Sequence, residues 1–506
     1  MKSKTALVYI PGWPLRTSSF MPKSSLAVLA GRMAGCDKPL RILDFGVVDT
    51  VRRFSGVLSE FSVKPAEAMI SNSFSSRLRR LFDNDGMGEF LRVRREWRTE
   101  IAGQIMGESP ERLVYLADTR DEYREARGVA LMVRRQNPHI QQCVIGTHAQ
   151  KYGVLFAASE EPFSHYGNNV EDWLLLPGVF GPGEPEPAAE YDPSVYPALY
   201  SGGKFHCFTV GTGGNSVGIC AEMRRIQRHV PVCAFDVAGS LPLARAMDMA
   251  AEFVARRMET AYACTLAPGG SAEGVASLLH ATGCRSAAVD VPTGSQRLLE
   301  DFYGCGYGVS QARNLMRILR AQGISVTAQL VYPCPRDDRH TRAETELLLD
   351  QSLPEGVVAG YPECHPRSRW AESPELFGFN CPPAQQLRWA RGDDRPELCD
   401  TGAPLPCGGM RGWTPESARA AQQSLLREVE TRGTVAGLGQ AEALIARVAG
   451  FEGREQAWHH RVQTALATGD FNELSALITA FNRRAAGAPR ANQPEWLPLD
   501  LAAAAN

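Results

Sequence analysis

The chain has 506 residues, and a usual domain size of roughly 150 residues predicts about three domains. Apolar residues make up 44% of it and charged residues 22%, and the formal net charge is −2, so neither a nucleic acid nor a membrane is indicated as a partner. No apolar run reaches the roughly 20 residues that span a bilayer, and the 13 scattered cysteines favour reduced thiols and a cytoplasmic location.

The first 178 residues alternate short apolar runs with helical patterns, which is typical of βαβ units. Helices are predicted at residues 24–35 and 123–135, and strands at residues 5–10, 40–48, 112–118 and 141–146. Parallel sheets bind ligands beyond the carboxyl ends of their strands. We therefore expect a Rossmann-like domain over residues 1–178, with its binding residues directly after these strands.

An arginine-rich helical insertion interrupts this pattern at about residues 55–110. Its arginines are interleaved with Glu89, Glu96 and Glu100, so a solvated helical face is the favoured interpretation and a phosphate-binding patch is the alternative. The arginines are Arg77, Arg79, Arg80, Arg92, Arg94, Arg95 and Arg98.

Residues 179–203 are dense in Pro, Gly and acidic residues, which predicts an interdomain linker. Strand and helix patterns then alternate again over residues 204–390, and such a succession predicts a full or partial (β/α) barrel. The pattern is wholly helical from Trp413 to about Arg484, so residues 391–506 are expected to form a small helical domain with an irregular tail.

Three residues of the barrel are candidate catalytic groups. Asp236 and Asp290 belong to predicted strands, at places where barrel carboxylates often face an active site, and Tyr332 follows the next strand at the same mouth. The alternative is that the two carboxylates cap the turn or helix that comes after them.

Residues 283–333, which include GCRSAAVDVPTGSQ and GISVTAQLVYP, resemble a characteristic stretch of radical S-adenosylmethionine (SAM) barrels, in which a strand and an ESGS turn precede a helix and a further strand. Residues 362–379 resemble a later segment of the same barrels. Residues 8–12, 43–45 and 145–149 are similar to the strand ends of the cobalamin-binding domain that precedes the barrel in one branch of the family. The chain is identified as a member of the cobalamin-binding radical SAM superfamily.

The resemblance implies an α/β fold: a Rossmann-like cobalamin-binding domain, a partial TIM barrel of radical SAM type and a small helical carboxyl-terminal domain. One departure is decisive. The CxxxCxxC triplet that holds the iron-sulfur cluster of these enzymes is absent, since residues 202–214 contain only Cys207 and the next cysteines are Cys220 and Cys233. We therefore expect cobalamin as cofactor, SAM as a further ligand, and no iron-sulfur cluster.

The resemblance also implies binding residues, for which ordinary turn residues are the alternative interpretation. For His148, a hydrogen-bonding role is preferred over ligation of cobalt, because the DxHxxG pattern is absent. The turn expected to contact SAM has Pro292 in place of the family's glutamate; its residues are Thr293, Gly294, Ser295 and Gln296. The residues expected to contact cobalamin are Pro11, Ser18, Ser19, Asp118, Thr119, Gly146, Thr147 and His148.

Three functions remain open on this basis. The first is an enzyme of specialised metabolism that moves a methyl group from SAM through methylcobalamin to a small-molecule or peptide substrate by polar chemistry, with an external reductant such as flavodoxin or ferredoxin. The second is a cobalamin-dependent cyclase or rearrangement enzyme, in which the cofactor itself supplies the radical. The third is a non-catalytic corrinoid-binding partner or sensor.

Overall fold

The computed structural model describes residues 4–13, 15–34, 40–52, 84–167, 189–211, 215–230, 234–392, 405 and 409–487. The chain forms two compact units. The first unit comprises Met1–Phe205, Pro383–Cys399 and His460–Thr479, and the second comprises His206–Pro382, Asp400–His459 and Ala480–Asn506. These units divide the chain differently from the three domains and linker expected from the sequence, since residues 189–203 belong to the first unit and the carboxyl-terminal helices are divided between both.

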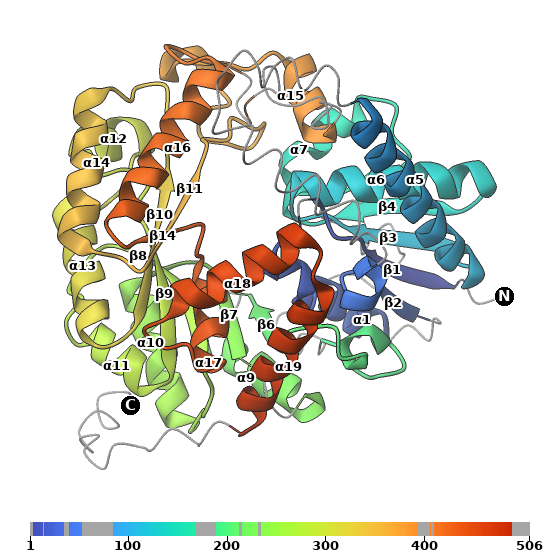
Figure 1. Ribbon diagram of the computed structural model, residues 1–506, viewed down its shortest axis with the longest axis horizontal. Coiled ribbons are helices and arrows are strands. Elements are labelled where there is room, and N and C mark those ends of the chain that lie inside the picture. Colours follow the sequence, from blue (N-terminus) through green and yellow to red (C-terminus); the bar gives the residue numbers. More distant parts are fainter. Residues whose placement is uncertain are drawn as a thin grey trace. The chain divides into compact units, whose positions relative to one another are not determined.

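The first unit contains a five-stranded parallel sheet in the order β2-β1-β3-β4-β5 (Figure 1). Its strands are β1 (Thr5–Tyr9), β2 (Leu40–Asp44), β3 (Arg112–Leu116), β4 (Gln141–Ile145) and β5 (His165–Tyr166). Every residue of β1 is buried, as expected of a central parallel strand covered on both faces. The predicted Rossmann-like sheet is confirmed.

Helices connect these strands and cover the sheet. They are α1 (Ser24–Ala34), α2 (Val48–Val51), α5 (Asn84–Gly107), α6 (Arg120–Gln136) and α7 (Thr147–Ala157), joined from far along the chain by α15 (Pro383–Arg391). The short 3-10 helices η1 (Thr17–Phe20) and η3 (Pro197–Tyr200) belong to the same unit. Helices α18 (Glu455–Thr468) and α19 (Phe471–Gly487) each contribute residues to both units.

Helix α5 corrects the prediction of a solvated arginine face. Arg94 and Arg98 of α5 form ion pairs with the fully buried Glu125 of α6, at 2.5 and 2.8 Å. On the same helix, Arg92 and Glu96 form an exposed pair. The interleaved charges of this segment belong to a helix that packs on a buried carboxylate. The charge pattern alone does not distinguish such a helix from a solvated one. Arg77, Arg79 and Arg80 lie outside the described residues.

The second unit contains a seven-stranded parallel sheet in the order β14-β11-β10-β9-β8-β7-β6 (Figure 1). Strands and helices alternate from β6 to β11, which confirms the partial (β/α) barrel. The strands are β6 (Cys207–Val210), β7 (Ala234–Pro242), β8 (Tyr262–Ala267), β9 (Cys284–Asp290), β10 (Ser325–Val331), β11 (Gly356–Gly360) and β14 (Val435–Ala436). The connecting helices are α9 (Ser216–His229), α10 (Leu243–Ala255), α11 (Val275–Ala281), α12 (Gln296–Leu298), α13 (Val309–Ala321) and α14 (Arg339–Ser352).

The later part of the second unit closes around this sheet. The antiparallel pair of β12 (Phe379–Asn380) and β13 (Gly409–Met410) is followed by α16 (Pro415–Thr431), which leads into β14. Helix α17 (Gln440–Val448) then packs against β7, β8, β9 and β10. No helix in the described part of the chain is long and apolar enough to cross a bilayer.

Candidate active site in the second unit

Alternate residues of β7 to β10 form the inner face of the second sheet, against which α17 packs. The side-chain amide of Gln440, the first residue of α17, donates to Asp236 of β7 at 3.4 Å. The amide of Gln329 on β10 donates to the Gln440 oxygen at 3.5 Å. Thr327, two residues earlier on β10, donates to the Leu438 carbonyl directly before α17. The start of α17 therefore joins β7 to β10 through polar side chains.

A bulge in β7 brings a second polar contact onto this face. The pairing of β7 with β8 shifts between Val237 and Ser240, and Gly239 in the bulge has a φ of 88°, which favours glycine. The Ser240 hydroxyl that follows donates to the carboxylate of Asp290, the last residue of β9. We call Asp236, Gln440, Gln329, Ser240 and Asp290 the inner polar track.

The two carboxylates of the inner polar track lie in a poorly solvated environment. Burial raises the pKa of Asp236 to about 6, although the hydrogen bond from Gln440 opposes this rise. Burial also raises the pKa of Asp290, against the hydrogen bond from Ser240. Asp236 is therefore a carboxylate that can accept a proton close to neutral pH, as a general base requires.

Tyr332, the third predicted catalytic residue, has other partners. It is 3% exposed, its carbonyl accepts from Gln422 at 2.8 Å, and its hydroxyl hydrogen-bonds Arg342 of α14. Burial raises its pKa to about 12. Asp236 and Asp290 thus share the inner face, whereas the recorded contacts of Tyr332 lead to α14 and α16, and its catalytic role stays a prediction.

The turn predicted to contact SAM packs on α14. The Gly294 N–H donates to the Thr345 hydroxyl at 3.0 Å, and a Cβ at Gly294 would lie 2.5 Å from the Thr345 Cα. The Thr293 hydroxyl accepts from the Ser295 N–H at 3.2 Å, and Gln296 accepts from the Val309 N–H at 2.9 Å. Several polar groups of this turn are therefore engaged within the protein, whereas the buried Ser295 hydroxyl lacks a partner in the described structure, and the contact of this turn with SAM stays a prediction.

In the first unit, two of the residues predicted to contact cobalamin, Asp118 and Thr147, are hydrogen-bonded to each other. Asp118, after β3, accepts from the Thr147 N–H at 3.0 Å and from its hydroxyl at 3.3 Å. Gly146 has a φ of 109°, and a Cβ there would lie 2.5 Å from the Ala117 carbonyl oxygen. Thr119 accepts from the Glu122 N–H and caps α6. The residues that follow β3 and β4 are thus hydrogen-bonded to each other, and Thr147 and Thr119 are exposed.

The Nε2 atom of His148 is engaged within the protein. Its Nε2 lies 2.9 Å from the Ala390 carbonyl oxygen of α15, and the residue is 4% exposed. Its ring packs against Tyr152 and Trp389, with centroids 4.9 and 5.8 Å away. The preferred hydrogen-bonding role therefore has a partner within the protein, which the sequence could not indicate because 242 residues separate His148 from Ala390.

The loop after β1 offers a mixed set of groups. Pro11 and Ser19 are buried, and the Ser19 hydroxyl accepts from the Arg16 N–H at 3.2 Å. Ser18 is exposed, and the buried Thr17 hydroxyl has no partner among the described residues. An exposed hydroxyl beside an unsatisfied buried one fits a ligand rich in amide groups, as the corrin ring of cobalamin is, at the carboxyl edge of this sheet.

A charged cluster at the same edge was not predicted from the sequence. Lys204 is fully buried and lies 2.8 Å from Asp44, the last residue of β2, which also accepts from the Tyr196 hydroxyl. The Tyr9 hydroxyl donates to Glu122 at 2.8 Å. Burial lowers the pKa of Lys204 to about 8, against the attraction of Asp44. A lysine directly after a predicted linker normally indicates a solvated residue, so the sequence holds no signal for this pair.

The residues of the inner polar track that the sequence analysis missed are Ser240, Gln329 and Gln440. A glycine within a strand pattern indicates a bulge, so Gly239 was a usable signal for Ser240. Gln440 belongs to a segment assigned to a separate helical domain. Among the described residues there is no group of three or more side chains able to hold a metal ion, and Cys233 lies outside them.

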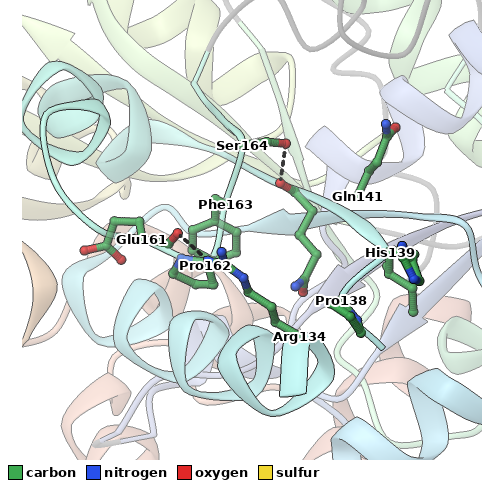
Figure 2. A pocket seen from close by; sticks show the side chains of 10 residues that line it. Arg134, Pro138, His139, Gln141, Glu161, Pro162, Phe163 and Ser164 are labelled. Atoms are coloured by element: carbon green, nitrogen blue, oxygen red, sulfur yellow. Dashed lines mark hydrogen bonds between the residues drawn. The ribbon is translucent and has the colours of Figure 1, made fainter. Parts of the chain in front are cut away.

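The first unit also has a cavity of about 430 Å³, lined by Arg134, Gln141, Glu161 and Ser164 among others (Figure 2). It lies where β4 begins, and the Ser164 hydroxyl donates to the Gln142 carbonyl beside it. Ligands of open parallel sheets bind at the opposite, carboxyl ends of the strands. This cavity therefore does not coincide with the predicted cofactor site.

No protein-family model and no curated protein matches the sequence. Among solved structures, the chain is similar to the radical S-adenosylmethionine methyltransferase TsrM from Kitasatospora setae, with cobalamin and a [4Fe-4S] cluster bound, at a TM-score of 0.54 and 13% identity over 92% of this chain and 100% of that one. It is similar to TsrM with tryptophan substrate and a SAM analogue (aza-SAM) at a TM-score of 0.53 and 12% identity, covering 88% and 92% of the chains. At such identities the likeness shows the fold.

Proposed function

Because the chain has the fold of the cobalamin-binding radical SAM superfamily, we propose that it catalyses a cobalamin-dependent methyl transfer from SAM by polar chemistry, without an iron-sulfur cluster. Two features support this function. The cysteine triplet of the family is absent from the sequence, which argues against cleavage of SAM to a radical. The second unit nevertheless keeps a polar inner face, with a carboxylate suited to proton transfer.

The Asp236 carboxylate is the observation that carries the proposal. Its pKa of about 6 lets it be ionised at neutral pH and still accept a proton readily. As a nucleophilic N–H, O–H or C–H group of the substrate gains a methyl group, it loses a proton, and Asp236 takes that proton. Gln440 holds the carboxylate in place through its amide N–H, and so acts as a positioning residue.

When bound, cobalamin supplies a cobalt centre that can accept and pass on a methyl group. In the first unit, the Thr17 and Ser18 hydroxyls and the exposed Thr147 are the groups that would hold it. S-Adenosylhomocysteine is the second product, since the methyl group leaves the SAM sulfonium. The proposal also requires an external reductant, for which flavodoxin and ferredoxin are candidates, to keep cobalt in its nucleophilic state.

A second candidate is a corrinoid-binding protein without catalytic activity, which the missing cysteine triplet favours. The two candidates differ in what they predict for SAM. The enzyme releases S-adenosylhomocysteine when it holds cobalamin and a reductant, whereas the binding protein leaves SAM unchanged.

The test is an anaerobic incubation of cobalamin-loaded protein with methyl-labelled SAM and titanium(III) citrate. Methyl transfer from SAM to cobalt supports the proposal when about one equivalent of S-adenosylhomocysteine forms per bound cobalamin and none forms without cobalamin. The Asp236→Asn variant should slow transfer to a substrate at least 100-fold, since general base catalysis contributes about 10² to 10⁴. The Asp248→Asn variant, which alters an exposed residue of α10, is the matched control. Formation of 5′-deoxyadenosine would contradict the proposal.

A further inference from the structure

The two carboxylates of the inner polar track have no cationic partner among the described residues. Asp236 accepts its hydrogen bond from the neutral Gln440, and Asp290 accepts from the neutral Ser240. The sequence contains no lysine after Lys204, so arginine and histidine are the only side chains of the second unit that could supply a positive charge. None of them forms an ion pair with either carboxylate in the described structure.

Other buried carboxylates of this protein are compensated. In the first unit Glu125 faces Arg94 and Arg98. In the second unit Glu455, which is 5% exposed, lies 2.7 Å from Arg447. Asp337, at the start of α14, accepts instead from the Cys334 N–H at 2.6 Å and from a threonine hydroxyl. A poorly solvated carboxylate without such partners is unfavourable, and its persistence is typical of a site that a ligand completes.

Asp290 is the better placed of the two to meet a ligand. Asp236 pairs with Ala263 on β8, which pairs with Ser286 on β9, so Asp290 lies four residues further toward the carboxyl end of its strand. At about 3.3 Å per residue this is about 13 Å along the strand direction. In barrels of this kind substrates arrive at the carboxyl ends of the strands. Asp236 lies deeper, where α17 begins.

Asp290 has the Tyr307 hydroxyl bonded to its backbone carbonyl at 2.5 Å, and two neighbours on the inner face, Gln329 and Ser240, offer side-chain acceptors. Gln329 is its register partner on β10 and gives its amide N–H to Gln440, which leaves its own oxygen available. Ser240 is exposed, and its oxygen has lone pairs that can accept. A protonated primary amine has three N–H donors and one positive charge, which match one carboxylate and two neutral oxygens.

We propose that Asp290, Ser240 and Gln329 bind a protonated primary amine of the substrate; this inference rests on the proposed function and adds the substrate class. The ammonium group supplies the charge that the inner face lacks. A substrate that presented only a carboxylate or a phosphate here would be repelled by Asp290. The amine would anchor the substrate at the mouth, while the group to be methylated reaches toward Asp236.

The test uses the full-length protein and three probes of matched size: phenethylamine, 2-phenylethanol and 3-phenylpropionate. Their dissociation constants are measured at pH 8 by ligand-observed NMR, with and without bound cobalamin. We expect the amine to bind at least tenfold more tightly than the alcohol, and the carboxylate most weakly. Asp290→Asn should remove the preference for the amine, Ser240→Ala should weaken amine binding several-fold, and Asp248→Asn should change neither.

Equal binding of amine and alcohol, or an amine preference that survives in Asp290→Asn, would overturn the inference. Thermal unfolding of each variant shows whether it is folded, and if Asp290→Asn does not fold, Ser240→Ala decides. The outcome is separable from that of the proposed function. An amine preference in a protein that binds no corrin supports this inference while the function fails, and methyl transfer to a substrate without an amine overturns this inference while the function stands.

Discussion

Gln440 donates its side-chain amide to the carboxylate of Asp236, at 3.4 Å, although 204 residues separate the two along the chain. The bond joins the start of α17 to the second strand of the barrel. It places a neutral donor, and no cation, beside a carboxylate that burial makes reluctant to ionise. The predictions for the second unit follow from this pair.

Asp236→Asn should stabilise the protein while it removes activity. Because the pKa of Asp236 is raised to about 6 in the folded state, folding loses stability as the pH rises from about 4 to about 6. At pH 8 this loss amounts to about 3 kcal/mol, which an uncharged asparagine avoids. Urea unfolding should show a gain of about 1 to 3 kcal/mol at pH 8 and little change at pH 4. A variant that is equally destabilised at both pH values would refute the assignment.

The methyl-transfer rate should depend on the ionisation of the same carboxylate. Since a general base must be deprotonated, kcat should rise with pH through about 6 and then level off. Gln440→Leu removes the hydrogen bond that favours the charged form, so the rising limb should move to higher pH. A profile that is flat between pH 5 and 8, in a reaction limited by chemistry, would exclude Asp236 as the base.

Lys204→Met should be strongly destabilising, because it leaves the buried Asp44 carboxylate without its cation. Loss of one partner of a buried pair costs about 3 to 5 kcal/mol. The matched control is Lys4→Met, whose partly exposed pair with Glu108 is worth about 1 kcal/mol or less. Denaturant unfolding measures both, and a Lys204→Met effect as small as the control would show that Asp44 does not need the lysine.

Glu125 should make the first unit sensitive to acid. The desolvation of this buried carboxylate is outweighed by Arg98 and Arg94, which hold its pKa at about 2. A carboxylate with a lowered pKa stabilises the fold above its unfolded pKa, so this contribution is lost as the pH falls from about 4.5 toward 2. Glu125→Gln should be less stable at pH 7 and lose less stability on acidification. Parallel curves for the two proteins, followed by circular dichroism, would contradict this.

His148→Phe should leave the spectrum of bound cobalamin unchanged. The His148 Nε2 is engaged with the Ala390 carbonyl, so the variant loses a buried hydrogen bond worth about 1 kcal/mol and keeps the ring packing against Trp389. Electron paramagnetic resonance of the cobalt(II) form tests for a nitrogen ligand. A nitrogen splitting that is present in the natural protein and lost in His148→Phe would show that His148 ligates cobalt.

Local patterns predicted the elements well where one apolar run makes one strand. The predicted strands at residues 5–10, 112–118 and 141–146 begin where β1, β3 and β4 begin and extend one or two residues further. The strand predicted at residues 40–48 is longer than the observed β2, which ends at Asp44, and Val48 already belongs to α2. The excess residues follow the last paired residue of each strand, and several of them, such as Ile10 and Ala117, are apolar, so an apolar run alone does not mark where a strand ends.

These sequence patterns could not predict which helices pack on which distant strands. Nothing in the sequence of α15 indicates that it covers His148, and nothing in α17 indicates that Gln440 meets Asp236. Both helices return to sheets formed much earlier in the chain, and periodicity shows which side of a helix is apolar but not what it packs against. Asp236 and Asp290 could be proposed because a parallel strand fixes where its residues point, whereas their neutral partners could not.

The most direct test of the proposed clusterless cobalamin enzyme is the cobalt and iron content, with the ultraviolet-visible spectrum, of protein purified anaerobically from cobalamin-fed cells. The account predicts corrin absorption, about one equivalent of cobalt and no stoichiometric iron. Iron-sulfur absorption with several equivalents of iron would contradict the absence of a cluster, and a protein that binds no corrin would contradict the proposed function itself.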